Sequence, residues 1–285
     1  MQRTDFRFFH RLRVRWAEVD MQKIVFNAHY LMYFDTAIAD YWRAMALPYE
    51  EAMVALGGDL YVKKATIEFH ASARMDDVLD VGMKCARIGN SSMAFTGGLF
   101  RQNDLLVSCE LLYVFADPAT QKAKPVPAAL RAAIDGYEAG EPMTEVSTGA
   151  WSALGEDASE LRRAVFIEEQ RIPKELEWDE HDATAVHAVA RNRIGQVIAT
   201  GRLLKDAEGI TRIGRMAVHR NLRSGGHGAS VLGALEQVAR DRGDAQVALH
   251  AQTSAERFYA RLGYQPHGER FEEAGIGHIE MRRKL

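Results

Sequence analysis

The sequence predicts an α+β protein of two domains, and three observations lead to that class. A helical pattern in residues 30–45 is followed, from Leu60 onward, by four stretches in which apolar residues alternate with other types. A stretch rich in breakers and small polar residues, 140–149, then interrupts the chain near its middle. Beyond it, an apolar strand, a glycine-rich turn and an amphipathic helix follow one another. With 285 residues, each half is long enough to bury its own core.

Composition limits the functions that the chain can have. Hydrophobic residues make up 47% and charged residues 26%, as in ordinary globular proteins, and the net charge of −3 argues against general nucleic-acid binding. No apolar run approaches membrane-spanning length and the N-terminus opens no signal peptide, so we expect a cytoplasmic protein. Cys85 and Cys109 are expected in the core, and the histidines lack metal-ligand spacing, so we expect no metal.

The first half begins with a predicted half-buried strand in which Leu12, Val14 and Trp16 share one face. A long helix follows, whose apolar residues are too numerous for one narrow stripe, so we expect sheet around much of it. These residues are Tyr30, Leu31, Phe34, Ile38, Tyr41, Trp42 and Met45. The four alternating stretches come next, separated by turn signals: 65–69, 79–85, 93–99 and 107–115. A helix from Ala128 to about Ala139 closes an antiparallel sheet curled around a central helix.

The second half begins with a helix that contains Leu161, Val165 and Phe166, followed by a strand at residues 197–203 and a turn at Lys205–Gly209. Residues 213–218 form a predicted buried strand that leads into the glycine-rich turn Arg223–Gly228. Glycines let the backbone approach a ligand, and the positive end of the next helix favours an anion. This turn could hold a diphosphate, with a charge-assisted bond from Arg223, or could merely connect the two elements.

The first half resembles the hotdog-fold acyl-CoA thioesterases of the 4-hydroxybenzoyl-CoA type over about residues 6–133. The resemblance lies in Asp20-x-x-x-Ile24-Val25-x-x-x-x-Tyr30 ahead of the long helix, and in Pro125-Val126-Pro127 before the closing helix. It implies thioester hydrolysis, with Asp20 as nucleophile or base and with N–H groups near Asn27 facing the oxyanion. Asp20 could instead cap a turn or a helix.

Two residues depart from the thioesterase pattern. Lys23 stands where the family often has glycine, and Asn27 stands where some members have histidine. Lys23 could be a solvated surface charge or could touch a CoA phosphate, and Glu18 has no assigned role. Because hotdog domains usually place the active site between subunits, the resemblance also implies a homodimer or a higher homo-oligomer.

The second half resembles the GNAT acetyltransferase superfamily over about residues 151–285, and its ending, 271–281, is similar to the ElaA-like branch. The segment from Met216 through the glycine-rich turn into a helix resembles the superfamily's acetyl-CoA signature. His227 stands where the superfamily usually has an aliphatic residue. The resemblance implies that acetyl-CoA is bound by Met216, Val218, Arg223, Ser224, Gly225, Gly226, His227 and Gly228.

The residues 255–264 resemble a later helix of the superfamily that commonly carries a tyrosine facing the CoA sulfur. Tyr259 is therefore the candidate acid that protonates the leaving thiolate, although it could also be a core aromatic residue beside Phe258. The base that takes the proton of the amine is not identified. Its candidates are Glu168, Glu169, Glu177 and Asp179.

We therefore expect a hotdog thioesterase domain at 1–139, a linker at 140–150 and a GNAT-type mixed α/β domain at 151–285. The first would hydrolyse an acyl-CoA, and the second would transfer the acetyl group of acetyl-CoA to an amine. Two alternatives are an acetyltransferase with a non-catalytic hotdog assembly domain, and a CoA-thioester sensor in which neither half reacts.

Overall fold

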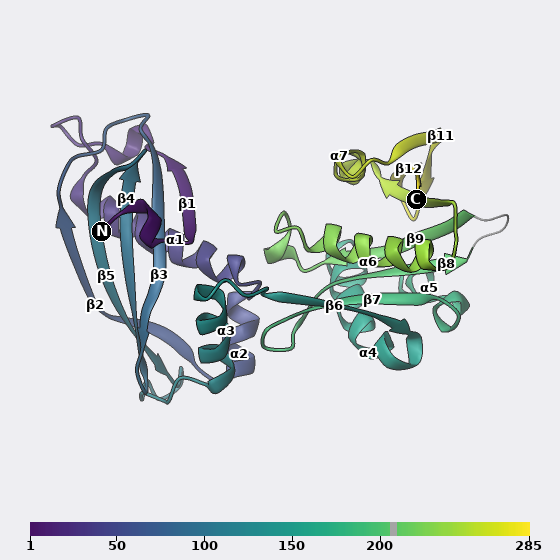
Figure 1. Cartoon of the computed structure of the whole chain (residues 1–285), viewed down its shortest axis with the longest axis horizontal. Coiled ribbons are helices and arrows are strands. Elements are labelled where there is room, and N and C mark those ends of the chain that lie inside the picture. Colours follow the sequence, from purple (N-terminus) through teal and green to yellow (C-terminus); the bar gives the residue numbers. More distant parts are fainter. Residues whose placement is uncertain (206–209) are drawn as a thin grey trace. The chain divides into compact units, whose positions relative to one another are not determined.

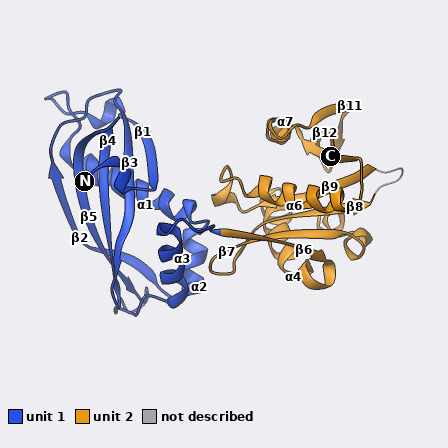
Figure 2. Cartoon of the chain, in the orientation of Figure 1, with its two compact units in different colours: residues 1–143 blue, residues 144–285 orange. Residues whose placement is uncertain are grey.

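The computed structural model describes residues 1–205 and 210–285, which form two compact units, Met1–Met143 and Thr144–Leu285 (Figure 2). The turn predicted at Lys205–Gly209 lies, apart from Lys205, outside the described residues. No helix in the described ranges is long and apolar enough to cross a membrane.

Unit 1 is an antiparallel sheet with a long helix packed against it (Figure 1). Five strands lie in the order β1-β3-β4-β5-β2, and all neighbouring pairs are antiparallel. The predicted order of strand, long helix and four strands is confirmed. The elements are η1 (Arg3–Asp5), β1 (Phe8–Arg13), η2 (Trp16–Glu18), α1 (Asn27–Ala44), α2 (Tyr49–Leu56), β2 (Asp59–Phe69), β3 (Val78–Ile88), β4 (Ser92–Arg101), β5 (Asp104–Ala116) and α3 (Ala128–Glu138).

Helix α1 approaches the sheet closely because Gly97 of β4 leaves room for it. A Cβ at Gly97 would lie 2.7 Å from ring carbons of Phe34 and 2.7 Å from the sulfur of Met83. About two turns further along α1, Tyr41 contacts Phe8 of β1 edge to face, with ring centroids 5.7 Å apart. Phe34 and Tyr41 are fully buried. The broad apolar surface of α1 is thus mostly covered, as its sequence predicts, except at Leu31, which is 39% exposed.

The first strand is shorter than the sequence predicts. Strand β1 ends at Arg13, Val14 is buried, and Trp16 is 80% exposed on the 3-10 turn η2. The reason is local hydrogen bonding, because the N–H and the Nε of Arg15 donate to the carboxylate of Glu18 at 2.7 and 2.6 Å. These hydrogen bonds close a 3-10 turn at residues 16–18, where the alternation of apolar and charged residues had predicted that the strand continues.

Unit 2 is a seven-stranded sheet in the order β11-β12-β10-β9-β8-β7-β6. Its strands are antiparallel except for β9 and β10, which pair in parallel. The elements are β6 (Thr144–Ala150), α4 (Trp151–Arg162), the π-helical η3 (Arg163–Glu169), α5 (Lys174–Glu177), η4 (Glu180–Ala183), β7 (Val186–Asn192), β8 (Val197–Lys205), β9 (Ile210–Val218), η6 (Arg220–Leu222), α6 (His227–Asp241), β10 (Gln246–Gln252), η7 (Thr253–Ala255), α7 (Glu256–Arg261), β11 (Gln265–Glu273) and β12 (Ile276–Lys284).

Helices α4 and α6 cover opposite faces of this sheet (Figure 1). Val189 of β7 packs against Leu154 of α4, and its partner across the ladder is Thr200 of β8. A Cβ on the next residue, Gly201, would lie 3.0 Å from Val231 of α6. Since consecutive residues of a strand face opposite sides, the two helices lie on the two faces.

The segment predicted as a linker, 140–150, is only partly irregular. Residues 144–150 form β6, an edge strand that pairs with β7 over its whole length. The sequence analysis missed this strand because Gly149 and the small polar residues resemble a linker. Thr144, Val146 and Thr148 nevertheless alternate along the segment, and β-branched residues at alternate positions suit a strand.

Candidate active sites

Strands β9 and β10 pair at first and then separate. Their parallel ladder joins 210–213 to 246–249. Both strands continue beyond it, β9 to Val218 and β10 to Gln252, and each remains paired with its neighbour on the other side. The inner edges of these continuing segments are not part of the described β9–β10 ladder. Their backbone N–H and C=O groups are therefore placed to meet a ligand that enters between the strands.

A bulge follows directly after the end of this ladder. Arg215 and Met216 of β9 lie opposite the single residue Gly201 of β8, where the register shifts. Arg215 has a φ of 52°, a left-handed conformation that non-glycine residues adopt at a cost. A Cβ at Gly201 would lie 2.5 Å from the sulfur of Met216, so the glycine makes room for this predicted CoA-binding residue.

The glycine-rich turn lies between β9 and α6. Ser224 and Gly226 have φ of 70° and 87°, and α6 begins at His227 without a side-chain cap. The first N–H groups of a helix have no partner within it and carry the positive end of its dipole. Since α6 is 15 residues long, this end of the helix is suited to an anionic group.

Three elements meet at the beginning of α6. A Cβ at Gly228 would lie 3.3 Å from Val218 at the end of β9 and 3.5 Å from Phe258 of α7. The structure therefore brings the predicted signature residues at the end of β9 and the start of α6 next to the helix that carries Tyr259.

The side chain of Arg223 does not point to an open anion site. Its two terminal nitrogens each donate to Glu169 at 2.6 Å, and its Nε donates to the carbonyl of Val218 at 3.2 Å. The hydrogen bonds from Arg223 lower the pKa of the Glu169 carboxyl. Arg223 thus joins the turn to the end of the π-helical segment η3, an arrangement that the sequence did not predict.

His227 is a buried residue at the first position of α6. Burial lowers the pKa of its imidazole, which favours the uncharged form. Its Nε2 would lie 2.9 Å from a Cβ at Gly225, so the turn has no room for a side chain there. A packing role fits this position.

Tyr259 is 8% exposed. Its ring contacts Phe258 and Tyr264 at centroid distances of 4.9 and 5.8 Å. Burial raises the pKa of its hydroxyl to about 12, so the side chain holds its proton throughout the neutral range. This state suits a proton donor, and it is also compatible with a core aromatic residue.

All four carboxylates that the sequence offered as bases pair with arginines: Glu168 with Arg163 at 2.6 Å, Glu169 with Arg223 at 2.6 Å, Glu177 with Arg162 at 2.5 Å and Asp179 with Arg202 at 2.7 Å. Glu177 is also almost completely buried. Hydrogen bonds from the guanidinium groups lower the pKa of the Glu169 and Asp179 carboxyls, so these two are weaker proton acceptors. At Glu177, burial outweighs the arginines and raises the pKa.

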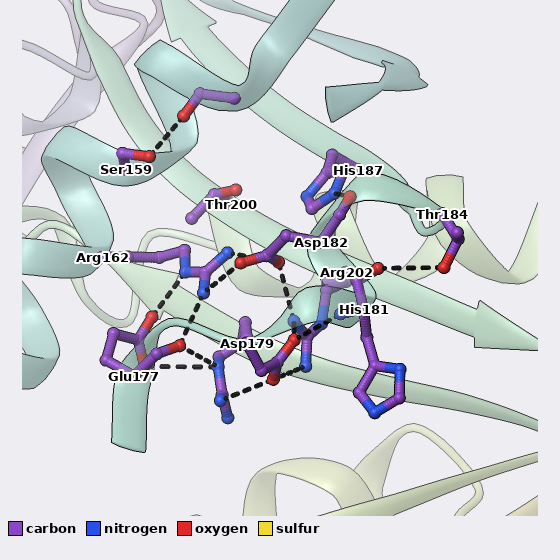
Figure 3. A network of polar contacts seen from close by, with 12 residues as sticks. Ser159, Arg162, Glu177, Asp179, His181, Asp182, Thr184, His187, Thr200 and Arg202 are labelled. Atoms are coloured by element: carbon purple, nitrogen blue, oxygen red, sulfur yellow. Dashed lines mark hydrogen bonds and ion pairs between the residues drawn. The ribbon is translucent and has the colours of Figure 1, made fainter. Parts of the chain in front are cut away.

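Two of these pairs belong to a buried network (Figure 3). Arg162 of α4 bonds both Glu177 and Asp182, and Arg202 of β8 bonds both Asp179 and Asp182. Burial alone would raise the pKa of Asp182, but the hydrogen bonds from the two arginines outweigh it and lower the pKa. The sequence analysis did not identify Arg162, Asp182 or Arg202.

The network also holds the bulge of β9. Arg215 donates through Nε to the backbone carbonyl of Glu177 at 3.1 Å and through Nη2 to the carboxylate of Asp179 at 3.1 Å. Its side chain thereby fixes the left-handed residue of the bulge, just beyond the point where β9 leaves β10. The buried charges thus act through Arg215 on the shape of the candidate site.

In unit 1, Asp20 lies in a tight turn ahead of α1. Its backbone N–H donates to the carbonyl of Ile24, and its carbonyl accepts from the N–H of Lys23, both at 2.9 Å. Its Oδ1 accepts from the N–H of Gln22 at 2.8 Å. Lys23 has a φ of 62°, which explains physically why glycine would be favoured at this position. One oxygen of Asp20 thus stabilises the turn.

The turn returns the chain to the start of α1. The N–H of Phe26 donates to the carbonyl of Glu18 at 2.9 Å, and the helix begins at the exposed residue Asn27. No side chain caps this end of the 18-residue helix. The N–H of His29 donates to the carbonyl of Phe26 at 2.9 Å, and the positive end of the helix dipole lies at Asn27.

Glu18 has a structural position that the sequence did not reveal. It is buried, and its carboxylate accepts hydrogen bonds from Arg15 and from the hydroxyl of Tyr33, the latter at 2.7 Å. Burial alone would raise the pKa of this carboxyl, but the hydrogen bonds outweigh it and lower the pKa. Glu18 holds the Asp20 turn against α1.

Among residues 1–205 and 210–285, no three His, Cys, Asp or Glu side chains are grouped in a way that could hold a metal ion.

Comparisons with known proteins separate the chain into the same two parts. A family model described as "Thioesterase-like superfamily" matches residues 14–134, and one described as "Acetyltransferase (GNAT) domain" matches residues 153–285. The chain is 37% identical over 126 residues to the uncharacterized N-acetyltransferase YjcF of Bacillus subtilis, covering 44% of this chain and 89% of the relative. It is 29% identical over 117 residues to the acyl-CoA thioester hydrolase YbgC of Escherichia coli O157:H7, covering 41% of this chain and 87% of the relative. A solved structure, a putative N-acetyltransferase from Lactobacillus plantarum, is similar with 30% identity and a TM-score of 0.48, covering 50% of this chain and 99% of the other.

Proposed function

We propose that the chain is a bifunctional CoA-thioester enzyme, because a thioesterase-like family model matches residues 14–134 and a GNAT acetyltransferase domain model matches residues 153–285. Unit 1 hydrolyses an acyl-CoA, and unit 2 transfers the acetyl group of acetyl-CoA to an amine. The observation that carries the proposal is in unit 2. There, the end of β9, the uncapped start of α6 and the helix that carries Tyr259 meet around Gly228.

In acetyl transfer, the backbone of the glycine-rich turn and the first turn of α6 hold the diphosphate of the substrate. This role is supported by the left-handed Gly226 and by the absence of a side-chain cap on α6. Met216 and Val218 line the edge of β9 along which the rest of acetyl-CoA lies. Arg223 fixes the turn through Glu169. Alignment of the two substrates supplies much of the rate acceleration.

Tyr259 donates its proton to the leaving thiolate. The raised pKa of about 12 supports this role because the hydroxyl remains protonated at neutral pH until a basic thiolate is formed beside it. Its position next to Phe258, which reaches Gly228, is a second argument for this role.

In thioester hydrolysis, Asp20 attacks the carbonyl or activates a water molecule, and the N–H groups at Asn27 stabilise the oxyanion. The hydrogen bond from Phe26 to Glu18 supports this arrangement, since it holds the Asp20 turn at the helix start. The competing role is structural, because Oδ1 of Asp20 already accepts the N–H of Gln22. That contact favours the alternative in which unit 1 only assembles the protein.

The protein is proposed to form a homodimer or a larger homo-oligomer through unit 1. Two observations support this. Strand β2 is an 11-residue sheet edge with mostly exposed side chains, and Trp16, Met21 and Phe26 expose large apolar surfaces around the Asp20 turn. Exposed edges and apolar patches of this kind are typical of association surfaces.

The test is thiol release from a panel of acyl-CoAs with and without added amines. Release without amine is expected from unit 1, and additional release with amine is expected from unit 2. Release only with amine would leave the single-activity acetyltransferase. Binding of acyl-CoA without any release would leave the sensor and would exclude both enzymatic activities.

A further inference from the structure

If acetyl-CoA lies where β9 and β10 separate, the base is expected beside that opening, and the first residue of β10 beyond the ladder is His250. The ladder ends with the pair of Ile213 and Leu249. The next residues, Gly214 and His250, are the first that this ladder does not join. Gly214 has no neighbouring atom within 4 Å of the position of a Cβ, so its surroundings are open.

The imidazole of His250 is held from both sides. Its Nδ1 lies 3.1 Å from the carboxylate of Glu273 on β11, and its Nε2 lies 2.5 Å from Nη1 of Arg212 on β9. Because a carboxylate accepts and a guanidinium donates, these partners assign the proton to Nδ1 and the lone pair to Nε2. This is the arrangement of a proton acceptor whose orientation is fixed by a carboxylate.

The surroundings of His250 form an exposed polar face with an aromatic wall. Glu280 of β12 lies 3.7 Å from Nε2, and the ring of Phe271 lies 4.8 Å from the imidazole. Gln252, two residues along β10 on the same face, donates to Gln170 at 2.9 Å, at the end of the π-helical segment. An amine that enters here meets the carboxylate of Glu273 and an aromatic ring, which suit its charge, and the carboxylate of Glu280, which it shares with Arg212 and Arg282.

His250 and Tyr259 lie on opposite sides of the sheet. His250 pairs with Glu280, and cross-strand partners point to the same face. Arg283, three positions further along β12, points to the other face, where it bonds Glu236 of α6 at 2.9 Å. Tyr264, which contacts Tyr259, bonds the same Glu236 at 2.8 Å. Tyr259 is thus on the α6 side, and His250 faces away from it.

We propose that His250 is the general base of acetyl transfer and that Glu273 is the positioning residue that orients it; both assignments rest on the proposed acetyltransferase function. The acceptor is an amine that binds on the face of Arg212, Glu273 and Glu280. In the reaction, the bound ammonium first loses one proton to solvent; the neutral amine nitrogen then bonds to the acetyl carbon and the C–S bond breaks. One proton passes from the amine to Nε2 of His250. For this transfer the amine takes the position beside Nε2 that the guanidinium of Arg212 occupies in the free protein. The thiolate takes the proton of Tyr259, and both side chains then exchange protons with solvent.

The assignment is tested by His250→Ala in the full-length protein. The amine is one that supports acetyl transfer by the wild type. Turnover of this amine should fall ~10²–10⁴-fold, the usual contribution of a general base, while the Kd for acetyl-CoA stays within twofold. Added imidazole should restore part of the turnover. His181→Ala, at another exposed histidine of unit 2, is the matched control and should retain wild-type turnover.

Glu273→Gln should lower kcat while leaving KM for acetyl-CoA nearly unchanged. Combined with His250→Ala, it should cause no further loss, since it acts through that residue. The control is Glu272→Gln, because Glu272 is the neighbouring strand residue and faces the other side.

The outcomes separate two kinds of failure. Wild-type turnover in His250→Ala, or a loss that imidazole does not restore, would overturn His250 as the base while leaving acetyl transfer intact. A wild-type protein that binds acetyl-CoA but releases no thiol with any amine would overturn the proposed function and this assignment together.

Discussion

The candidate site of unit 2 is built from several elements around a buried charge network, whereas that of unit 1 is a turn and a helix start on an exposed surface. In unit 2, Arg162 is 1% exposed and bonds two carboxylates, and the network reaches the β9 bulge through Arg215. In unit 1, Asp20 is held by the backbone of its own turn, next to the fully exposed Met21.

This difference indicates what each site depends on. The shape of the unit 2 site is fixed by contacts within one chain, so substitutions far from the substrate should affect it. Around Asp20, Trp16, Met21 and Phe26 expose large apolar surfaces, so the unit 1 site should depend on whatever covers them. A second copy of unit 1 is the proposed cover.

The largest expected effect separates the two chemistries. Tyr259→Phe removes the proton donor and should lower amine-dependent turnover ~10²–10⁴-fold, with little change in the affinity for acetyl-CoA. Hydrolysis without amine should be unchanged, because Tyr259 belongs to unit 2. Stopped-flow measurement of thiol release, with and without added amine, checks both expectations. Full amine-dependent turnover in the variant would return Tyr259 to the role of a core aromatic residue.

The next effect tests whether the buried network holds unit 2 together. Arg162→Met leaves Glu177 and Asp182 without a major partner and should destabilise unit 2 by about 3–5 kcal/mol. The adjacent Arg163→Met breaks only the exposed pair with Glu168 and should cost ~0–1 kcal/mol. Hydrogen exchange resolved by mass spectrometry distinguishes the units. Equal protection of β7–β9 in the two variants would contradict the comparison.

A smaller effect concerns the glycine-rich turn. Arg223→Ala should weaken acetyl-CoA binding by about 1–3 kcal/mol, the range for loss of a charged hydrogen-bond partner. If Arg223 acts by fixing the turn on Glu169, then Glu169→Ala should weaken binding by a similar amount. Calorimetric titration of both variants decides this. Tighter binding in Glu169→Ala would instead mean that the released guanidinium binds the diphosphate directly.

The smallest expected effect is on the stability of unit 2, and it appears only at acidic pH. The pKa of Asp182 is lower in the folded protein, so its contribution to stability is complete above the unfolded value of about 4. The contribution is lost as pH falls through the folded pKa. Denaturant unfolding of unit 2 between pH 5 and pH 3 should show this loss. Arg162→Met should reduce the acid dependence, because it removes one of the donors that lower the pKa.

The sequence predicts what local patterns determine. The five strands and the long helix of unit 1 follow from periodicity, and the strand, glycine-rich turn and helix of unit 2 follow from residue types. Tertiary pairing is harder to predict. Arg162 and Arg163 are adjacent in sequence, yet the first is buried and the second exposed, because only the first faces the segment that carries Glu177 and Asp182.

Three further features of the structure were not predicted from the sequence. Strand β6 contains few large apolar residues, since it is an edge strand, and so resembled a linker. Arg202 stands inside an otherwise apolar strand, a pattern that could have indicated a buried charge with a partner. His250 is a polar residue at an alternating position of an apolar strand, which predicts only that it faces one side of the sheet. Its contact with Glu273 depends on the packing of β10 and β11 on either side of β12.

The most direct test of two separate activities is Asp20→Asn, measured with and without amine. Asparagine keeps the shape of the side chain and an oxygen that can accept the N–H of Gln22, but it is neither a nucleophile nor a base. The folded, oligomeric variant should lose amine-independent hydrolysis of acyl-CoA and should keep amine-dependent acetyl transfer. If hydrolysis by the wild type is retained in the folded variant, Asp20 is not the centre of a thioesterase, and the assignment of that activity to this site is wrong.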